Sequence, residues 1–331
     1  MNPLGPSLLK WYGRMRRPLP WRLKADPYRV WVAETMLQQT TIAAVLPRYG
    51  RFLRRFPDLK SLADARCEAV LREWAGLGYY ARARNLHTSA RLVMAEHKGK
   101  LPADESALRR LPGVGAYTAA AVLSIAFNQP FAVVDGNVIR VLCRIFGIRS
   151  DARTSSTQRL LGQKAQDLLD RRHPGDWNQA VMELGETICL PENPHCGECP
   201  WNRYCIAKAK DWQDRLPVLG PRPKTTDLRL HCLWIEKNGS VLLFKRGPKE
   251  LILKNLWGLP EEHQLKSQKG ALMKTVRHAI TRYRITLVLH RGQLAGRKPT
   301  QTRWVARKNL KDFLVSSLWL KALTGARPTA S

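Results

Sequence analysis

Four cysteines lie close together in this chain, where their thiolates could converge on one metal centre. Cys189, Cys196, Cys199 and Cys205 have the spacing C-x6-C-x2-C-x5-C, while three other cysteines are scattered. Four thiolates bind either a tetrahedral zinc ion or an iron–sulfur cluster, and ligand softness does not separate the two. Prolines within the stretch interrupt any long helix and favour a loop that carries ligands. The alternative is a chance cluster of unreactive cysteines.

Two carboxylates stand in surroundings that could give them different protonation states. Glu34 lies among apolar residues in VWVAETMLQQT, where desolvation would raise its pKa so that it holds a proton near neutral pH. Asp135, in FAVVDGNVIRVLCR, follows an apolar β-branched stretch and precedes an amphipathic segment, and its simplest role is a helix N-cap. As a pair they fit glycosidic-bond chemistry, in which one acid protonates the leaving group and one carboxylate stabilises the cationic sugar.

A glycine-containing turn, LPGVG, runs directly into the apolar segment AYTAAAVLSIA. Gly113 and Gly115 allow a positive φ and a close backbone approach, and a helix that starts here offers unpaired N–H groups at its positive end. With the preceding helical segment 104–110, this is a helix–hairpin–helix arrangement that could bind phosphate. The alternative is an ordinary tight turn between two packed helices.

The charge balance indicates a polyanionic partner. The chain has 331 residues, with 56 Lys+Arg against 26 Asp+Glu and a formal net charge of +30. Hydrophobic residues make up 44% of the sequence, which is enough for packed cores and excludes charge-driven disorder over most of the chain. We therefore expect nucleic acid as the partner. With no membrane-length apolar run and no export signal, we expect an unexported protein, cytoplasmic or associated with a bacterial nucleoid.

The elements that must position these residues divide the chain into two domains. Residues 1–212 are predicted to be helical, with apolar residues at three- and four-residue steps over 27–46, 61–75, 80–97, 115–127, 137–147 and 155–170. Residues 213–227 are rich in proline and are predicted to be a linker. Residues 228–325 are predicted to be α+β, with a hairpin at Asn238-Gly239, further strands near 283–290 and 301–306, and a helix at 311–323. Residues 326–331 are predicted to be a disordered tail.

Several motifs in combination resemble the adenine DNA glycosylases of the endonuclease III superfamily. They are LPWR (19–22), VWVAETMLQQT, GLGYYARARNLH (76–87), LPGVG-x-Y-T (111–118), VDGNVIRVLCR (134–144), WNQAVMELG (177–185) and the four cysteines. The resemblance implies a mainly α, two-lobed helix–hairpin–helix domain, followed by an α+β Nudix-like domain. It also implies that the cysteines hold a [4Fe–4S] cluster with a structural and DNA-positioning role.

The resemblance assigns a role to each group near the two carboxylates. Glu34 would be the general acid that protonates the flipped adenine, and Asp135 would stabilise the oxocarbenium ion, with Asn137 orienting it. Tyr117 matches the position where the bifunctional enzymes carry a Schiff-base lysine, and no lysine occurs between Leu101 and Gln163. We therefore expect a monofunctional glycosylase, which leaves an abasic site without cutting the strand.

The resemblance also implies two sets of DNA contacts. The groups around the extruded base would be Trp21, Arg22 and Gln179, and the wedge that fills the gap in the stack would be Gln38, Gln39 and Tyr79. The expected partner is double-stranded DNA with an adenine mispaired with 8-oxoguanine or guanine, bound by a monomer.

The second domain departs from the family pattern. It lacks a glycine followed by Arg-Glu-x-x-Glu-Glu, so we expect no nucleotide hydrolysis. Where the family's reading loop has Phe-Ser-His, this chain has Ile280-Thr281-Arg282. The hydroxyl of Thr281 could bond the oxidised base, whereas Arg282 adds a charge suited to phosphate.

Two other functions are compatible with parts of the sequence. A thymine or uracil mismatch glycosylase of the same superfamily would share the helical domain and the cluster, but LPWR, ETMLQQT, Gln179 and the additional domain speak against it. A lesion-binding protein without catalysis would be favoured by the absence of Glu34 or Asp135, and both are present.

Overall fold

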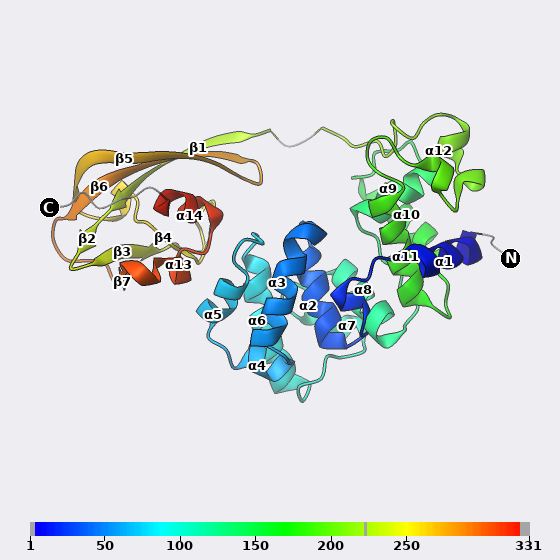
Figure 1. Cartoon of the computed structure of the whole chain (residues 1–331), viewed down its shortest axis with the longest axis horizontal. Coiled ribbons are helices and arrows are strands. Elements are labelled where there is room, and N and C mark those ends of the chain that lie inside the picture. The colour runs from blue at the N-terminus through cyan, green and yellow to red at the C-terminus, as the bar shows by residue number, and fades with distance from the viewer. Residues whose placement is uncertain (1–3, 222–223, 325–331) are drawn as a thin grey trace. The chain divides into compact units, whose positions relative to one another are not determined.

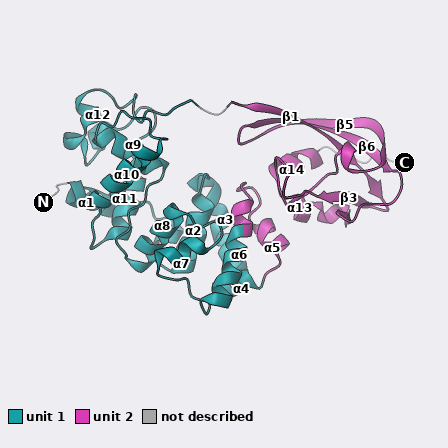
Figure 2. Ribbon diagram, turned by 180° about the vertical axis from the view of Figure 1, so that it is seen from behind, with its two compact units in different colours: residues 1–64, 85–221 teal, residues 65–84, 222–331 magenta. Residues whose placement is uncertain are grey.

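A computed structural model describes residues 4–221 and 224–324 of the chain. Contacts divide the molecule into two compact units, one of residues 1–64 and 85–221 and the other of residues 65–84 and 222–331 (Figure 2). No described helix is both long and apolar enough to cross a membrane. The tail 326–331, predicted to be disordered, lies outside the described residues.

The first unit is helical, as predicted (Figure 1). Its helices are α1 (Leu4–Met15), α2 (Pro27–Leu37), α3 (Ile42–Arg55), α4 (Leu59–Ala63), the greater part of α6 (Ala81–Glu96), α7 (Glu105–Arg110), α8 (Ala116–Phe127), α9 (Gly136–Ile145), α10 (Ser155–Leu168), α11 (Pro174–Thr187) and α12 (Ile206–Ala209). Short 3-10 turns lie at Pro20–Arg22, Cys196–Glu198 and Asn202–Tyr204.

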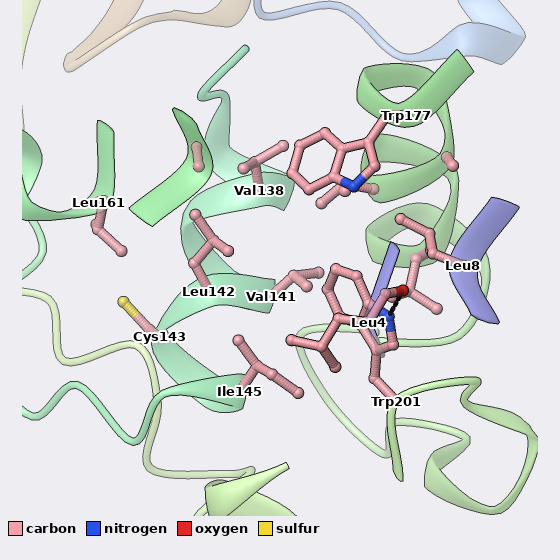
Figure 3. Packing of buried hydrophobic residues seen from close by; sticks show 14 of the residues in the cluster. Leu4, Leu8, Val138, Val141, Leu142, Cys143, Ile145, Leu161, Trp177 and Trp201 are labelled. Carbon is pink, nitrogen blue, oxygen red and sulfur yellow. Dashed lines mark hydrogen bonds between the residues drawn. The ribbon is translucent and has the colours of Figure 1, made fainter. Parts of the chain in front are cut away.

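One apolar core of this unit lies between α1, α9, α10 and α11 (Figure 3). Trp177 of α11 and Trp201 of the cysteine segment are fully buried in it. The indole N–H of Trp201 donates to the carbonyl of Leu4 at 2.8 Å, a bond drawn in Figure 3. Because Cys189, Cys199 and Cys205 pack against the same core, the cysteine segment is fixed to folded helices.

Helix α2 is buried on nearly all sides, including Val32, Ala33 and Met36. A helix that is apolar all round has no solvent-facing side, and α2 packs closely on the alanine-rich α8. The predicted helix 27–46 is wrong as a single element. It ends at Leu37, Gln39 has a φ of 53°, and a new helix starts after the N-cap Thr41. The left-handed residue ends the helix before its apolar pattern ends.

The helix–hairpin–helix consists of α7, the turn 111–115 and α8. Gly113 has a φ of 80°, and a Cβ at this position would lie 2.8 Å from the Cβ of Asn85, so the turn requires glycine here. Gly115 differs from our expectation of positive φ, because it is the N-cap of α8 at φ −88° with open space around its Cα. It provides no capping side chain, and the first N–H groups of α8 stay free of a side-chain cap.

The second unit contains two small sheets and short helices. One sheet has the order β1 (Thr226–Trp234), β6 (Tyr283–Leu294) and β5 (Ser267–Ile280), with β1 parallel to β6 and β5 antiparallel to it. The other contains β2 (Glu236–Lys237), β3 (Ser240–Lys245), β4 (Trp257–Gly258) and β7 (Thr302–Ala306). The helices are α5 (Cys67–Glu73), α13 (Leu310–Phe313) and α14 (Ser317–Leu323).

The hairpin at Asn238-Gly239 is confirmed, with φ values of 48° and 68° that suit a tight turn between β2 and β3. The helix predicted over 311–323 is instead α13 and α14, because Ser316 caps a new helix by accepting from the N–H of Leu318. Strand β5 was not predicted. It contains lysines, lacks a clean alternation and has two register shifts against β6.

Residues 65–84, which the sequence pattern places in the helical domain, group by contacts with the second unit. Within that unit α5 packs on α13, and the hydroxyl of Tyr80 donates to the carbonyl of Val315 at 2.6 Å. These contacts join segments more than two hundred residues apart, a separation that no local pattern can reveal.

Candidate active site

A cavity of about 490 Å³ in the helical unit brings together most of the predicted catalytic and base-contacting residues. Those that line it are Trp21, Arg22, Glu34, Gln39, Tyr117, Asp135, Asn137 and Gln179. They come from the 3-10 turn 20–22, from the end of α2, and from α8, α9 and α11. Six of the seven motifs that carry the resemblance lie in this unit, and five of them contribute residues to this one cavity.

Glu34 is a deeply buried acid in the cavity wall, with 4% of its surface exposed. Burial raises its pKa to about 7, and the nearby charge of Asp135 acts in the same direction. The hydrogen bond from Tyr117 and the charge of Arg22 oppose this rise without cancelling it. Glu34 is therefore an acid that carries a proton for a large fraction of the time at neutral pH, as predicted from its apolar neighbours.

Tyr117 is the direct partner of Glu34. Its hydroxyl donates to Oε2 of Glu34 at 2.7 Å. Burial and the two neighbouring carboxyl groups raise the pKa of Tyr117 well above its ordinary value, so the phenol stays protonated and remains a donor. Because Oε2 accepts this bond, the carboxyl proton of Glu34 is favoured on Oε1.

Asp135 is both an N-cap and a wall of the cavity. Its Oδ1 accepts a hydrogen bond from the backbone N–H of Val138 at 2.7 Å. This bond caps α9, so the N-cap role predicted for Asp135 is confirmed. Its Oδ2 accepts from Nδ2 of Asn137 at 3.3 Å. Burial raises the pKa of Asp135, while the backbone N–H groups of Val138 and Asn137 act to lower it. The cap and the site role are thus compatible, since each uses a different oxygen.

Asn137 is held in place from two sides. Arg140 donates to its Oδ1 at 2.9 Å, and Gly185 of α11 faces it so closely that a Cβ there would lie 2.7 Å from the Cβ of Asn137. Arg140 is itself anchored on the carbonyls of Gly185 and Cys189, each at 2.8 Å. The site carboxylate, α9 and the first cysteine are therefore linked by one chain of hydrogen bonds.

Sequence reasoning missed an acidic group that organises one side of the cavity. Glu183, 1% exposed, accepts from Nε of Arg17 at 2.6 Å and from Nη2 of Arg22 at 2.8 Å. Burial alone would raise the pKa of Glu183, but the two guanidinium groups hold it below its ordinary value. Arg17 and Glu183 are 166 positions apart in the sequence. The one local signal for this ion pair is the acidic residue inside the motif WNQAVMELG.

Of the remaining residues predicted to contact DNA in this unit, Gln179 and Trp21 line the cavity and Gln38 does not. Gln179 lines it, with its amide donating to the carbonyl of Gly175 at 3.2 Å. Trp21 packs edge-on against Tyr49 at 5.3 Å between ring centroids. Gln38 does not line the cavity, because its amide donates to the hydroxyl of Thr118 at 2.8 Å.

Three predicted residues belong to the second unit. Tyr79 and Thr281 line a cavity of about 610 Å³ within that unit, and Arg282 does not line it. Both lining residues have positive φ, 45° for Tyr79 and 52° for Thr281, which is uncommon for side chains of this size and is concentrated at functional sites. The same cavity is lined by His278, which lies just before the expected reading loop, and by Ser317, which the sequence did not indicate.

The four cysteines occupy the segment that follows α11 and ends at the start of α12. The buried guanidinium of Arg144 supports this segment, donating to the carbonyls of Leu190 and Pro191 at 2.6 and 2.9 Å, with Nη1 3.4 Å from Sγ of Cys189. A positive charge at this position suits a centre built from thiolates.

Comparison with known proteins places the chain in a family. The profile of the HhH-GPD superfamily of base excision DNA repair proteins matches residues 32–166. The adenine DNA glycosylase of Buchnera aphidicola subsp. Acyrthosiphon pisum is 33% identical over 267 residues, 80% of this chain and 75% of that protein. The rat adenine DNA glycosylase is 45% identical over 234 residues, 68% of this chain. The chain belongs to the adenine DNA glycosylase family.

The chain spans about half the length of the mammalian family members, 45% of the rat protein and 42% of the human one. Among solved structures, a thermostable thymine-DNA glycosylase has a TM-score of 0.58 and 30% identity, covering 62% of this chain and 95% of its own. Endonuclease III in a non-covalent DNA complex has a TM-score of 0.55 and 22% identity, covering 63% of this chain and 95% of its own. The helical fold is therefore shared beyond the family.

Replacing Glu34 by Gln should stabilise the helical unit more at pH 8 than at pH 4.5. The unfolded chain releases the Glu34 proton near pH 4.5, whereas the folded chain keeps it up to about pH 7, so the wild type loses stability across this interval. Gln has no proton to lose, and the gain at pH 8 should be on the order of 1–3 kcal/mol. Thermal unfolding followed by circular dichroism measures it, with Glu105→Gln as the surface control. Equal changes at both pH values would contradict the burial of an acid.

Proposed function

We propose that this protein hydrolyses the N-glycosidic bond of adenine mispaired with 8-oxoguanine or guanine in duplex DNA. The observation that carries the proposal is the pair Glu34 and Asp135 in one cavity, the first with its pKa raised to about 7. The bond between N9 of adenine and C1′ of the sugar breaks, water adds to C1′, and the leaving base takes up a proton. The substrate named for the relatives in the family supports adenine as the base.

The two carboxyl groups divide the work between them. Glu34 delivers its Oε1 proton to a ring nitrogen of the adenine, so that the base leaves as a neutral molecule; an acid with a pKa near the working pH is efficient in this role. Asp135 lies where its carboxylate form can stabilise the positive charge that grows on the sugar. Asn137 and Arg140 keep Oδ2 of Asp135 in position.

The reaction stops at base removal. A strand-cutting lyase needs an amine that forms a Schiff base with the opened sugar. The described residues that line the cavity include Arg17, Arg22 and Arg140 but no lysine. Arginine stays protonated and is no nucleophile under these conditions, so the product is an intact strand with an abasic site.

The DNA contacts follow from the same residues. Arg22, fixed by Glu183, and Gln179 present donors to the edge of the extruded adenine, beside the ring of Trp21. Gln38 and Gln39 fill the gap in the stack, and the strained backbone of Gln39 suits such a role; Tyr79 of the other unit has a positive φ as well and is proposed to contact the DNA. The free N–H groups at the start of α8, after Gly113 and Gly115, bind a backbone phosphate.

A [4Fe–4S] cluster fits the cysteine segment. Cys189, Cys196, Cys199 and Cys205 would hold it, and three of them pack against the core of the helical unit. When bound, the cluster fixes the fold of this segment and supplies no step of the hydrolysis. Arg144 on one side and the Arg140–Cys189 bond on the other connect its loop to α9, the helix that Asp135 caps.

The second unit is proposed to be a Nudix-like domain that reads the base opposite the adenine. Its cavity of about 610 Å³ contains Thr281, whose hydroxyl donates to the carbonyl of Ile280 at 2.7 Å and keeps its lone pairs for a donor on the base. Arg282 extends over the ring of Tyr283 at 5.3 Å and lies outside the cavity, which suits a contact with phosphate.

A thymine mismatch glycosylase is the second candidate, favoured by the solved structure of a thymine-DNA glycosylase with a TM-score of 0.58. The two activities differ in the base that the cavity accepts, so a substrate panel separates them.

Replacing Glu34 by Gln should abolish adenine release while duplex binding is retained within about twofold. Gln keeps the size of the side chain and its acceptor toward Tyr117 but has no acidic proton, and loss of a general acid costs about 10²–10⁴-fold in rate. Single-turnover adenine release and gel-shift binding on an A:8-oxoguanine duplex measure both. Full activity in this variant would rule out the assignment.

A panel of duplexes carrying A, T or U opposite guanine and 8-oxoguanine should yield release of adenine alone. In the same panel, Arg282→His should increase the preference for 8-oxoguanine over guanine by about fivefold, the effect of one added hydrogen bond. Arg284→His, which changes an exposed arginine paired with Asp227, is the matched control and should leave the preference unchanged. Release of thymine or uracil with adenine left intact would contradict the proposal and favour the second candidate.

A further inference from the structure

Three metal-binding side chains converge in the second unit, away from the cysteines. His231, Glu262 and His290 each offer one ligand atom, and these three atoms all lie within 4.8 Å of one another. The side chains are partly buried. Neither the proposed catalysis nor the reading of the opposite base uses them.

The sheet itself brings the three together. In the parallel pair β1–β6, Leu233 is the partner of His290, and His231 lies two residues before Leu233, so both histidines are on one face of the sheet. On the other side of β1, an antiparallel bridge joins Cys232 to Glu261, which sets Glu262 opposite His231. The N–H of Leu233 also donates to the carbonyl of Pro260 at 2.8 Å. Backbone pairing thus fixes all three Cα atoms.

The histidine nitrogens are prepared to be ligands. Nδ1 of His231 is buried and has no hydrogen-bond partner among the described residues, a costly state for a polar atom. Nδ1 of His290 lies 3.3 Å from the carbonyl of Gly270. A carbonyl only accepts, so Nδ1 of His290 carries the hydrogen and Nε2 has its lone pair free; this is how a backbone carbonyl orients a metal-binding imidazole.

Glu262 provides the negative charge. Nζ of Lys269 lies 2.7 Å from Oε1 of Glu262, and the lysine side chain is 42% exposed. The carboxylate has a second oxygen, and Lys269 has room to move into solvent when a cation arrives.

We propose that His231, Glu262 and His290 bind one divalent transition-metal ion of the zinc class. Two imidazoles and one carboxylate form a common three-ligand set for zinc, with water in the fourth position. Ligand bonds of about 2.0–2.2 Å put the ligand atoms of a tetrahedral site about 3.4 Å apart, which is compatible with three atoms that lie within 4.8 Å of one another. The ion would join β6, β1 and the segment 260–264 to one another.

Zinc binding to the full-length chain, without an affinity tag, tests the site. Equilibrium dialysis against ZnCl₂, with zinc and iron counted by mass spectrometry, should give one more zinc per chain in the wild type than in His231→Ala/His290→Ala. This difference is independent of what the cysteines hold. His231→Ala alone should weaken binding by at least about 100-fold, since it removes a ligand outright. His263→Ala, an exposed neighbour outside the cluster, should bind as the wild type does. Equal zinc in the wild type and the double variant would overturn the proposal.

A second measurement needs no variant. Zinc K-edge absorption of the wild type loaded with one equivalent of ZnCl₂ should show nitrogen and oxygen ligands with imidazole scattering. Sulfur ligands would assign the zinc to the cysteines and overturn the proposal.

The variant Lys269→Ala should bind zinc more tightly than the wild type, because it removes a competing cation from Glu262. Weaker zinc binding by this variant would contradict the proposed role of Glu262 as a ligand.

Discussion

Desolvation of the Glu34 carboxyl is the constraint on which the candidate site depends. Burial among Val32, Ala33 and Met36 disfavours the charged form of this carboxyl group. Its pKa therefore rises from the ordinary value for a glutamate to about 7. The Glu34 side chain cannot turn toward solvent, because α2 is buried on nearly every side against α3 and α8. Tyr117 gives the acid its single strong partner and fixes which oxygen carries the proton.

Burial raises the pKa of the second carboxyl group as well, but its surroundings oppose the rise more strongly with backbone donors. Asp135 is also buried, but backbone N–H groups at the start of α9 donate to it, and Asn137 with Arg140 holds its other oxygen. Two acids in one cavity therefore differ because one sits in an apolar helix and the other at a helix N-terminus. The loop of the cysteines is tied to the same helix through Arg140 and Arg144, so the metal segment and the chemistry share a support.

Sequence predicted those parts of the molecule that local patterns encode. The three- and four-residue periodicity gave the helices of the first unit, the apolar neighbours of Glu34 gave its raised pKa, and Asn238-Gly239 gave a hairpin. What it missed depends on distant contacts. Glu183 gains its role from Arg17, 166 residues away, and residues 65–84 join the second unit through Val315 and α13. Strand β5 was missed because its lysines and bulges hide the alternation of a strand.

The pKa of Glu34, measured directly, tests this account most closely. In protein labelled with ¹³C at the glutamate side-chain carboxyl, the carbon resonance of Glu34 is the one absent from the Glu34→Gln spectrum, and its chemical shift can be followed from pH 4 to pH 9. We expect a titration midpoint near pH 7. A midpoint near the ordinary value of about 4.3 would show an ionised, solvated carboxylate and would contradict the role of Glu34 as the proton donor.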